Sequence, residues 1–260
     1  MAVTKKIWQV FPRLTERVWQ DHAEAGMLGG PYDPDHAVRV GQMALEIAED
    51  EQTGILAGAG GLVHNADRLI QHKMKLGWHC DAPKEEVERL VIQSLATDPY
   101  FDFGSSWTDD MAAYNIKREI VNAVLKHDGK NSDDDSPVLV TLMDAERLIN
   151  AESDLIIRSG QFYHDLPPID PIHFASDPEA TYRDPKSVLR DIMESIECLT
   201  PGTPFYVRLP KARALAAERR VFFDLFLQNL VNCRMLTGFH PYPPELLALR
   251  EKFAVAAATK

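Results

Sequence analysis

Four widely spaced polar positions lie on the buried side of segments whose apolar residues recur with helical spacing. They are His36, the pair His64-Asn65, His127 and Asp144. Imidazoles and carboxylates seldom point into a helical core without a partner, because their removal from water costs free energy. A divalent metal ion is the simplest partner for all four, since it binds both histidine nitrogen and carboxylate oxygen. The pattern therefore predicts a metal site.

Each of these residues, taken alone, has a simpler structural explanation. Asp144 could pair with Arg147 three residues later, or its carboxylate could cap a nearby helix. His36 and His64 could be ordinary buried histidines, and His127 could interact with the dipole at the end of its helix. The metal hypothesis therefore depends on the joint occurrence of the four positions.

The segments around these residues all have the periodicity of helices. We predict a first helix over residues 5–25. Asp33 is a typical helix N-cap and Pro34 suits the first helical position. The helix that follows carries His36 on its apolar face, together with Val40 and Ile47.

A further helix is predicted over residues 54–71, with His64-Asn65 in its middle. Its many glycines and alanines lower helix propensity but allow neighbouring helices to come close, so we expect it to be central and tightly packed. Two more helices are predicted over residues 84–96 and 111–127, the latter ending at His127. Ser136-Pro137 then opens the helix that carries Asp144.

No convincing strand pattern occurs, so we expect an all-α protein. The segments 97–110 and 160–186 are rich in turn residues, and we expect them to be irregular loops that shape a pocket. We predict a helical domain over residues 1–186, with its core at about 30–150. Residues 187–260 are predicted to form a C-terminal helical extension packed on the same domain.

The net charge of −11 argues against a general nucleic-acid binder, because phosphate contacts need a basic face. The three cysteines are isolated and form no CxxC pair, which argues against a disulfide framework or a zinc ribbon. We see no apolar run long enough for a membrane span and no signal-peptide pattern, so we predict a cytoplasmic protein. The apolar stretch Val221–Leu236 could pack within its own chain or form a homodimer.

Four stretches of the sequence resemble the HD-domain metal-dependent phosphohydrolase superfamily, over about residues 30–150. They are DPDHAVRV, GGLVHNADRL, EIVNAVLKHDGK and LVTLMDAERL. The signature of that superfamily is a histidine, a His-Asp pair and a distant aspartate on an all-α scaffold. The last stretch resembles the text D-A-D-R-L around the distant aspartate. The resemblance implies an HD-domain-like helical bundle with additional C-terminal helices.

The resemblance also implies a ligand set made of His36, His64, Asn65 and Asp144. Asn65 stands where the superfamily has aspartate, and a neutral amide bridges two metals poorly. We therefore expect one divalent ion. Mn²⁺ suits the mixed nitrogen and oxygen ligands best, and Mg²⁺, Fe²⁺, Co²⁺ and Zn²⁺ are alternatives.

The reaction implied is hydrolysis of a phosphoester or phosphoanhydride by a metal-activated water. The expected substrate is a nucleotide or another small phosphorylated metabolite. We expect His127 to contact the phosphate or protonate the leaving group. The cations expected to bind the substrate, each of which could instead be a solvated surface group, are Arg68, Lys126, Lys130 and Arg147.

Asp67 could be a substitute ligand, a hydrogen-bond partner of a ligand or the base that activates water, or it could pair with Arg68 or Lys73. His72 and His79 flank a lysine-rich turn, and we expect both to be solvated. Two other functions stay open. One is a degenerate protein that binds a nucleotide or partner without turnover. The other is an oxidative enzyme with two irons, which the missing bridging carboxylate disfavours.

Overall fold

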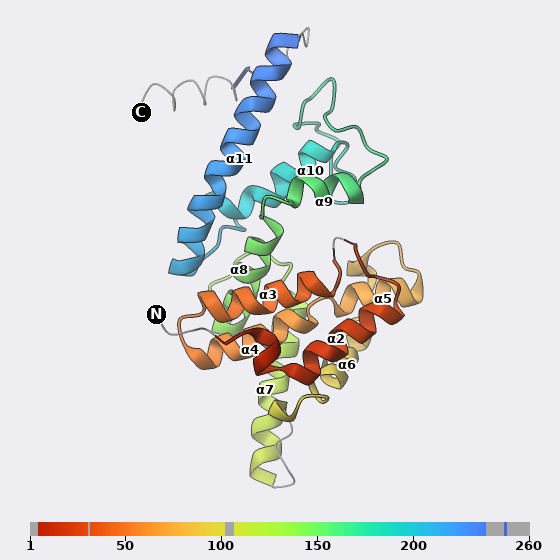
Figure 1. Cartoon of the computed structure of the whole chain (residues 1–260), viewed down its shortest axis with the longest axis vertical. Coiled ribbons are helices and arrows are strands. Elements are labelled where there is room, and N and C mark those ends of the chain that lie inside the picture. The colour runs from red at the N-terminus through yellow and green to blue at the C-terminus, as the bar shows by residue number, and fades with distance from the viewer. Residues whose placement is uncertain (1–4, 31, 102–106, 238–246, 249–260) are drawn as a thin grey trace. The chain divides into compact units, whose positions relative to one another are not determined.

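The computed structural model describes residues 5–30, 32–101, 107–237 and 247–248, and within 107–113 only the backbone. These residues form helices and isolated β-bridges but no strand, which confirms the all-α class. The chain divides into two compact units (Figure 1). Unit 1 comprises Met1–Ile149 with Val207–Arg213, and unit 2 comprises Asn150–Tyr206 with Ala214–Lys260.

This division differs from the one predicted from the sequence. We expected a boundary at residue 186, whereas the structure divides the chain after Ile149, at the end of a helix. The irregular segment 160–186 therefore groups with the C-terminal helices. The candidate site residues all belong to unit 1.

Unit 1 consists of helices joined by short connections. In chain order they are α1 (Ile7–Val10), α2 (Pro12–Glu24), α3 (Pro34–Ile47), α4 (Glu51–Val63), α5 (Ala66–Met74), η1 (His79–Asp81), α6 (Lys84–Leu95), η2 (Pro99–Phe101), α7 (Trp107–Lys126) and α8 (Pro137–Asn150). The predicted starts at Pro34 and Pro137 are confirmed, as is the helix predicted over 84–96. Helix α7 starts earlier than predicted, and residues 102–106 of the predicted loop lie outside the described residues.

The first predicted helix is in fact two helices, α1 and α2. The break falls at Phe11, which has φ −127° and ψ 67°, immediately before Pro12. Proline has no N–H to donate and restricts the residue before it to non-helical conformations. Pro12 is instead the first residue of α2, the position that tolerates proline best.

The helix predicted over residues 54–71 is also interrupted, at His64-Asn65. Helix α4 ends at Val63, and His64 is its C-cap residue, which still has α-helical backbone angles. Asn65, with ψ 12°, leaves the helical conformation and directly precedes α5. The prediction that this pair lies in the middle of one helix is therefore wrong. The side chain of His64 therefore lies at the end of α4.

Helices α3 and α4 approach each other unusually closely, as the small residues of α4 predicted. A Cβ atom on Gly61 would lie 2.6 Å from the backbone nitrogen of Gly41, and one on Gly41 would lie 2.9 Å from the Gly58 carbonyl oxygen. No side chain fits at these contacts. The two helices lie side by side in Figure 1, and α2 and α7 also pack on α4, which makes α4 the central helix of unit 1.

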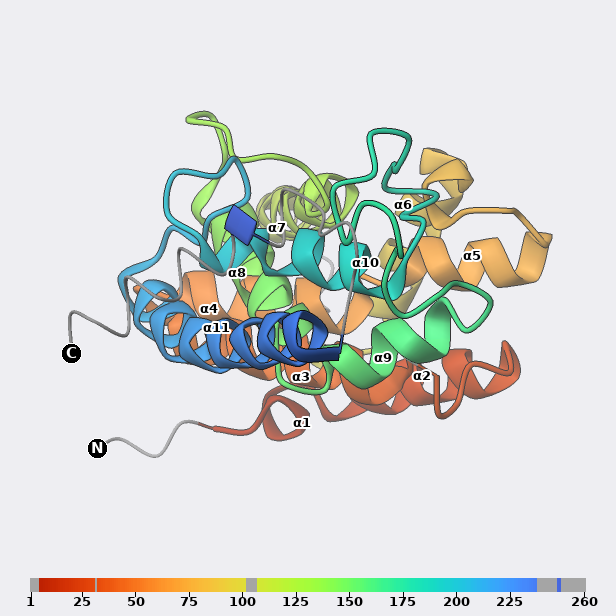
Figure 2. The ribbon, with the colours of Figure 1, turned by 90° about the horizontal axis from the view of Figure 1, so that it is seen from above.

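Unit 2 contains α9 (Leu155–Phe162), α10 (Val188–Ser195), η3 (Ile196–Leu199) and α11 (Pro210–Thr237), whose first turn belongs to unit 1. Helices α9 and α10 pack on each other, and the irregular loop between them is visible in Figure 2. A salt bridge of 3.1 Å joins Arg219 on α11 to Glu152 within this unit. Among the described residues, no helix combines the length and the apolar character needed to cross a membrane.

Candidate metal centre

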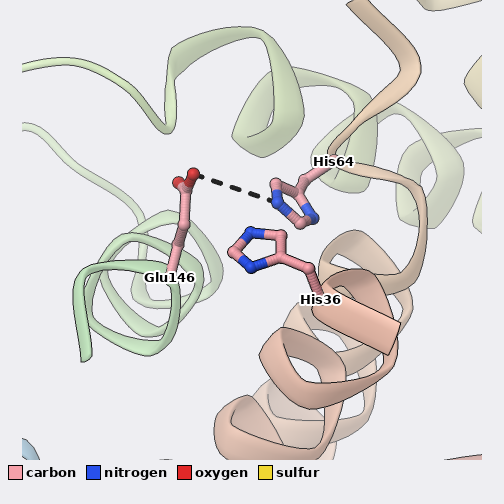
Figure 3. Close-up of side chains that lie close together, drawn as sticks. All are labelled: His36, His64 and Glu146. Atoms are coloured by element: carbon pink, nitrogen blue, oxygen red, sulfur yellow. Dashed lines mark ion pairs between the residues drawn. The ribbon is translucent and has the colours of Figure 1, made fainter. Parts of the chain in front are cut away.

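Three buried side chains from different helices converge in unit 1: His36, His64 and Glu146. Each offers a ligand atom, and these atoms all lie within 4.8 Å of one another. Figure 3 shows the two imidazole rings and the carboxylate pointing toward one another, from α3, the end of α4 and α8. The ring centroids of the two histidines are 5.2 Å apart. Two histidines and one carboxylate in this arrangement could hold a divalent metal ion.

His64 is oriented by a hydrogen bond from its own ring. Its Nδ1 lies 2.6 Å from the carbonyl oxygen of Gly61, and because a carbonyl can only accept, Nδ1 must carry the proton. Nε2 is therefore left with a lone pair, which is buried without a hydrogen-bond partner and lies 3.9 Å from Glu146 Oε1. Burial and the nearby His127 lower the pKa of His64 to about 3, so the ring is neutral at physiological pH. This is the state of a histidine that binds a metal.

His36 is held at the start of α3. Its backbone N–H donates to the Asp33 carboxylate, the side-chain N-cap of that helix, at 3.1 Å. Its ring is 3% exposed and makes an edge contact with Tyr32, with ring centroids 5.5 Å apart. Helix capping thus holds the backbone of His36, and the hydrogen bond to Gly61 orients the ring of His64.

The carboxylate of this cluster is Glu146, whereas the sequence pointed to Asp144. Asp144 belongs to none of the metal-ligand groups found among the described residues. Its Oδ2 accepts the backbone N–H groups of Arg208 and Leu209, both at 2.7 Å, directly before α11. The structure thus agrees with the simpler explanation, in which this carboxylate holds the start of another helix.

The reason for this difference is the rotation of α8. Successive residues of an α-helix are about 100° apart, so residues 144 and 146 point to nearly opposite sides. Asp144 faces the turn before α11, and Glu146 faces the histidines. The text DAERL contains both acidic residues, and the superfamily text D-A-D-R-L has an acidic residue at both positions. This second acidic position in the superfamily text could have indicated Glu146 as a candidate from the sequence.

Asn65 follows His64 but lies in a different environment. It is 2% exposed, its side-chain Nδ2 has no hydrogen-bond partner, and it lines a small cavity with residues of α2 and α6, among them His22 and Ser94. A role for Asn65 as a ligand stays a prediction.

The candidate site extends beyond these three side chains to His127. The Nδ1 of His127 donates to the Val124 carbonyl at 2.5 Å, and its Nε2 lies 3.4 Å from Glu146 Oε2 and 3.5 Å from Asp128 Oδ1. Burial by itself lowers the pKa of His127, but the charges of Asp128 and Glu146 outweigh it and raise the pKa to about 9. Without another cation, this histidine is protonated near neutral pH.

Asp67 pairs with His79, a histidine that we expected to be solvated. His79 is 4% exposed, and its Nδ1 lies 2.6 Å from Asp67 Oδ2. Burial raises the pKa of Asp67, but the hydrogen bond to His79 and the charge of Arg68 outweigh it and lower the pKa to about 2. The pair also lies near the cluster, because Asp128 Oδ2 is 3.8 Å from His79 Nδ1. The prediction that His79 is solvated is therefore wrong.

The four cations predicted to bind substrate differ in their surroundings. The Arg68 guanidinium stacks 3.5 Å above the centroid of the Tyr32 ring. Burial raises the pKa of Glu146, and the charge of Arg68 is one of the influences that oppose this rise. Arg147 instead donates to Asn131 at 2.7 Å and to the Gly129 carbonyl at 2.8 Å, which ties the preceding loop to α8. Lys126 and Lys130 are exposed.

Comparison of the chain with protein-family models, with curated proteins and with solved structures finds no match. The functional argument therefore rests on the geometry of unit 1 and on the chemistry of its side chains.

Proposed function

We propose that this chain is a metal-dependent phosphohydrolase of the HD-domain type. The observation that carries the proposal is the lone pair of His64 Nε2, which is buried without a hydrogen-bond partner and faces Glu146. A buried nitrogen acceptor opposite a carboxylate is stabilised when a cation binds both. His36 supplies a third ligand, and a site with three protein ligands keeps open positions for water and substrate.

The ligand set suits a divalent metal of intermediate softness. Two imidazole nitrogens and one carboxylate oxygen fit Mn²⁺, and also Fe²⁺, Co²⁺ or Zn²⁺, while Mg²⁺ prefers a site richer in oxygen. When bound, such an ion lowers the pKa of water and offsets negative charge on a phosphate. Electrostatics of this kind favours a phosphoester or phosphoanhydride over a neutral substrate.

Residues around the ligands have the chemistry that phosphate hydrolysis needs. The stacked guanidinium of Arg68 can donate hydrogen bonds to a phosphate oxygen, because arginine presents several donors in one plane. The charges of Asp128 and Glu146 raise the pKa of His127, which favours a proton on Nε2 that can pass to the leaving oxygen. The substrate we propose is a nucleotide or another small phosphorylated metabolite.

The test is metal-dependent release of inorganic phosphate. Protein treated with a chelator and then supplied with Mn²⁺ is incubated with nucleoside mono-, di- and triphosphates. We expect release by the wild type, loss of release in Glu146→Gln, and retention in Asp144→Asn, the matched control two residues away on the opposite side of α8. Absence of release from every substrate by metal-loaded wild type would contradict the proposal.

A second function is favoured by one observation, the asparagine at position 65. A protein that has lost a charged ligand would bind a nucleotide without hydrolysing it. Titration calorimetry with the same nucleotides separates the two functions. Binding without phosphate release supports the degenerate protein, and release supports the enzyme.

A further inference from the structure

A small cavity lies inside unit 1, between residues of α2, α4, α5 and α6. Its volume is about 10 Å³, close to the space that one water molecule needs. Its walls are mostly apolar, and three neutral polar side chains also line it: His22 on α2, Asn65 directly before α5 and Ser94 on α6. The three residues of the candidate metal centre are not among its lining residues, so the cavity is a separate feature.

His22 brings a nitrogen lone pair to this cavity. Its Nδ1 lies 2.7 Å from the carbonyl oxygen of Val18, one turn earlier, and because a carbonyl can only accept, Nδ1 carries the proton. Burial lowers the pKa of His22, which favours this neutral form. Nε2 is therefore an acceptor on the side of the ring that faces away from the α2 backbone. It is buried without a hydrogen-bond partner, in a residue that is 1% exposed.

Asn65 brings the complementary group. Its Nδ2 can only donate, and it too is buried without a hydrogen-bond partner, in a residue that is 2% exposed. A buried donor or acceptor that is left alone costs free energy. The two groups line the same cavity but do not bond to each other directly. Polar groups in this situation are commonly bridged by a water molecule.

The cavity suits a water molecule better than an ion. Water both donates and accepts, so it can bond to His22 Nε2 and Asn65 Nδ2 at once, and the hydroxyl of Ser94 offers a third partner. The charged residue among those that line the cavity is Asp21, and both of its carboxylate oxygens lie 2.9 Å from nitrogens of Arg17. No uncompensated charge is therefore available there for a cation or an anion.

We infer that one water molecule occupies this cavity, donates a hydrogen bond to His22 Nε2 and accepts one from Asn65 Nδ2. His22 is then a positioning residue, which acts through the water on the side chain of Asn65 in the break between α4 and α5. A neutral amide suits this position, because a carboxylate would bury a second negative charge in the cavity that Asp21 also lines. The inference goes beyond the proposed function and stands whether or not the chain binds a metal.

The experiment detects the water by nuclear magnetic resonance on the metal-free full chain, labelled with ¹³C and ¹⁵N. Overhauser contacts between water and assigned protons, recorded also in the rotating frame to separate them from proton exchange, locate a water that stays bound. The ¹⁵N shifts of the His22 ring show which nitrogen carries the proton.

Three variants are compared with the wild type. His22→Gln keeps an acceptor on this side chain, and His22→Phe removes it. Thr15→Val is the control, because it removes another hydroxyl of α2 that is buried without a partner but does not line the cavity.

We expect one bound water in the wild type, with contacts both to the side-chain amide protons of Asn65 and to the His22 ring, and a proton on His22 Nδ1. Thr15→Val should keep these contacts. His22→Gln should keep the contact between water and the Asn65 amide, whereas His22→Phe should lose it and shift the amide resonances of Asn65. Should His22→Phe fail to fold, the wild type and His22→Gln still decide the matter.

Three results would overturn the inference. They are the absence of a bound water at either residue in the wild type, a proton on His22 Nε2 in place of Nδ1, and a water contact of Asn65 that survives in His22→Phe. None of them bears on the proposed function, because phosphate release depends on a different set of side chains. Failure of phosphate release would likewise leave this water site in place.

Discussion

At the scale of single residues, the rotation of α8 decides which of its two acidic side chains faces the histidines. Asp144 accepts two backbone N–H groups in a fully buried position, whereas Glu146 faces His64 and His127. The two residues differ by one methylene in chemistry and by their direction on the helix. Their variants should therefore have opposite effects on metal binding.

We predict that Asp144→Asn keeps its metal but lowers the free energy of unfolding by about 1–3 kcal/mol, because a weaker, neutral amide oxygen replaces the charged acceptor of two backbone N–H groups. Glu146→Gln should lose the metal while the metal-free protein stays as stable as the wild type or becomes more stable. Burial raises the pKa of Glu146, which means that its charge is costly in the fold. Urea unfolding and elemental analysis measure both effects. Metal loss in Asp144→Asn with retention in Glu146→Gln would reverse the assignment.

His22 gives a prediction about pH. It is 1% exposed, its Nδ1 lies 2.7 Å from the Val18 carbonyl, and burial lowers its pKa below the ordinary 6.5. The unfolded chain therefore takes up a proton at a higher pH than the folded protein does. The contribution of neutral His22 to the free energy of unfolding is complete above pH 6.5. It decreases as the pH falls from 6.5 toward the pKa of His22 in the folded protein.

The variant His22→Gln tests whether His22 makes the protein less stable as the pH falls. The free energy of unfolding of the wild type, measured in urea between about pH 7.5 and pH 5, should fall more steeply with decreasing pH than that of the variant. The difference between the two proteins isolates His22 from the other histidines, since those titrate in both. Parallel pH profiles would show that the His22 pKa is the same in the folded and unfolded protein.

At the scale of elements, the contact between α3 and α4 fixes the distance between His36 and His64, the first two proposed ligands. His36 lies on α3 and His64 directly follows α4, and Gly61 lies one turn before His64. Any side chain on Gly61 would meet the backbone of Gly41. A shift of either helix would therefore change the separation of the two imidazole rings.

We predict that Gly61→Ala destabilises the protein by about 1–3 kcal/mol or more and weakens metal binding, because α4 must move away from α3. Gly60→Ala is the matched control. Its Cβ would meet the end of the Leu142 side chain at 3.3 Å, a group that can move, so it should have little effect. Thermal unfolding and Mn²⁺ titration measure the two quantities. Equal behaviour of the two variants would mean that the helices have room to adjust.

At the scale of the whole molecule, the proposed metal ligands span residues 36 to 146 and all belong to unit 1. A metal that binds only the folded state stabilises it by about 2.7 kcal/mol when its concentration is 100 times the Kd. This stabilisation should be confined to the unit that supplies the ligands.

We therefore predict that Mn²⁺ slows backbone hydrogen exchange in α3, α4 and α8 and leaves the exchange of α9 and α10 unchanged. Hydrogen exchange followed by mass spectrometry, with and without a chelator, measures this difference. Protection that appears in α9 and α10 instead would point to the Asp170–His173–Asp177 group as the metal site.

Local sequence features determined much of the architecture. Helix periodicity and the caps Asp33-Pro34 and Ser136-Pro137 predicted the starts of α3 and α8. The glycines of α4 predicted its close packing, because only a residue without a side chain allows two backbones to approach so closely. These features depend on a few neighbouring residues and on the spacing of one helix, so they can be read without tertiary structure. They also selected His36, His64 and His127, which lie together in the fold.

Only the tertiary structure decided which groups face one another. The pairing of His79 with Asp67 and the choice of Glu146 over Asp144 depend on contacts between different elements of the fold. A burial pattern shows that a carboxylate is inside the protein but not which neighbour it meets there. That is set by the rotation of each helix against the others, as Asp144 illustrates: the turn that its carboxylate holds lies more than sixty residues later in the sequence.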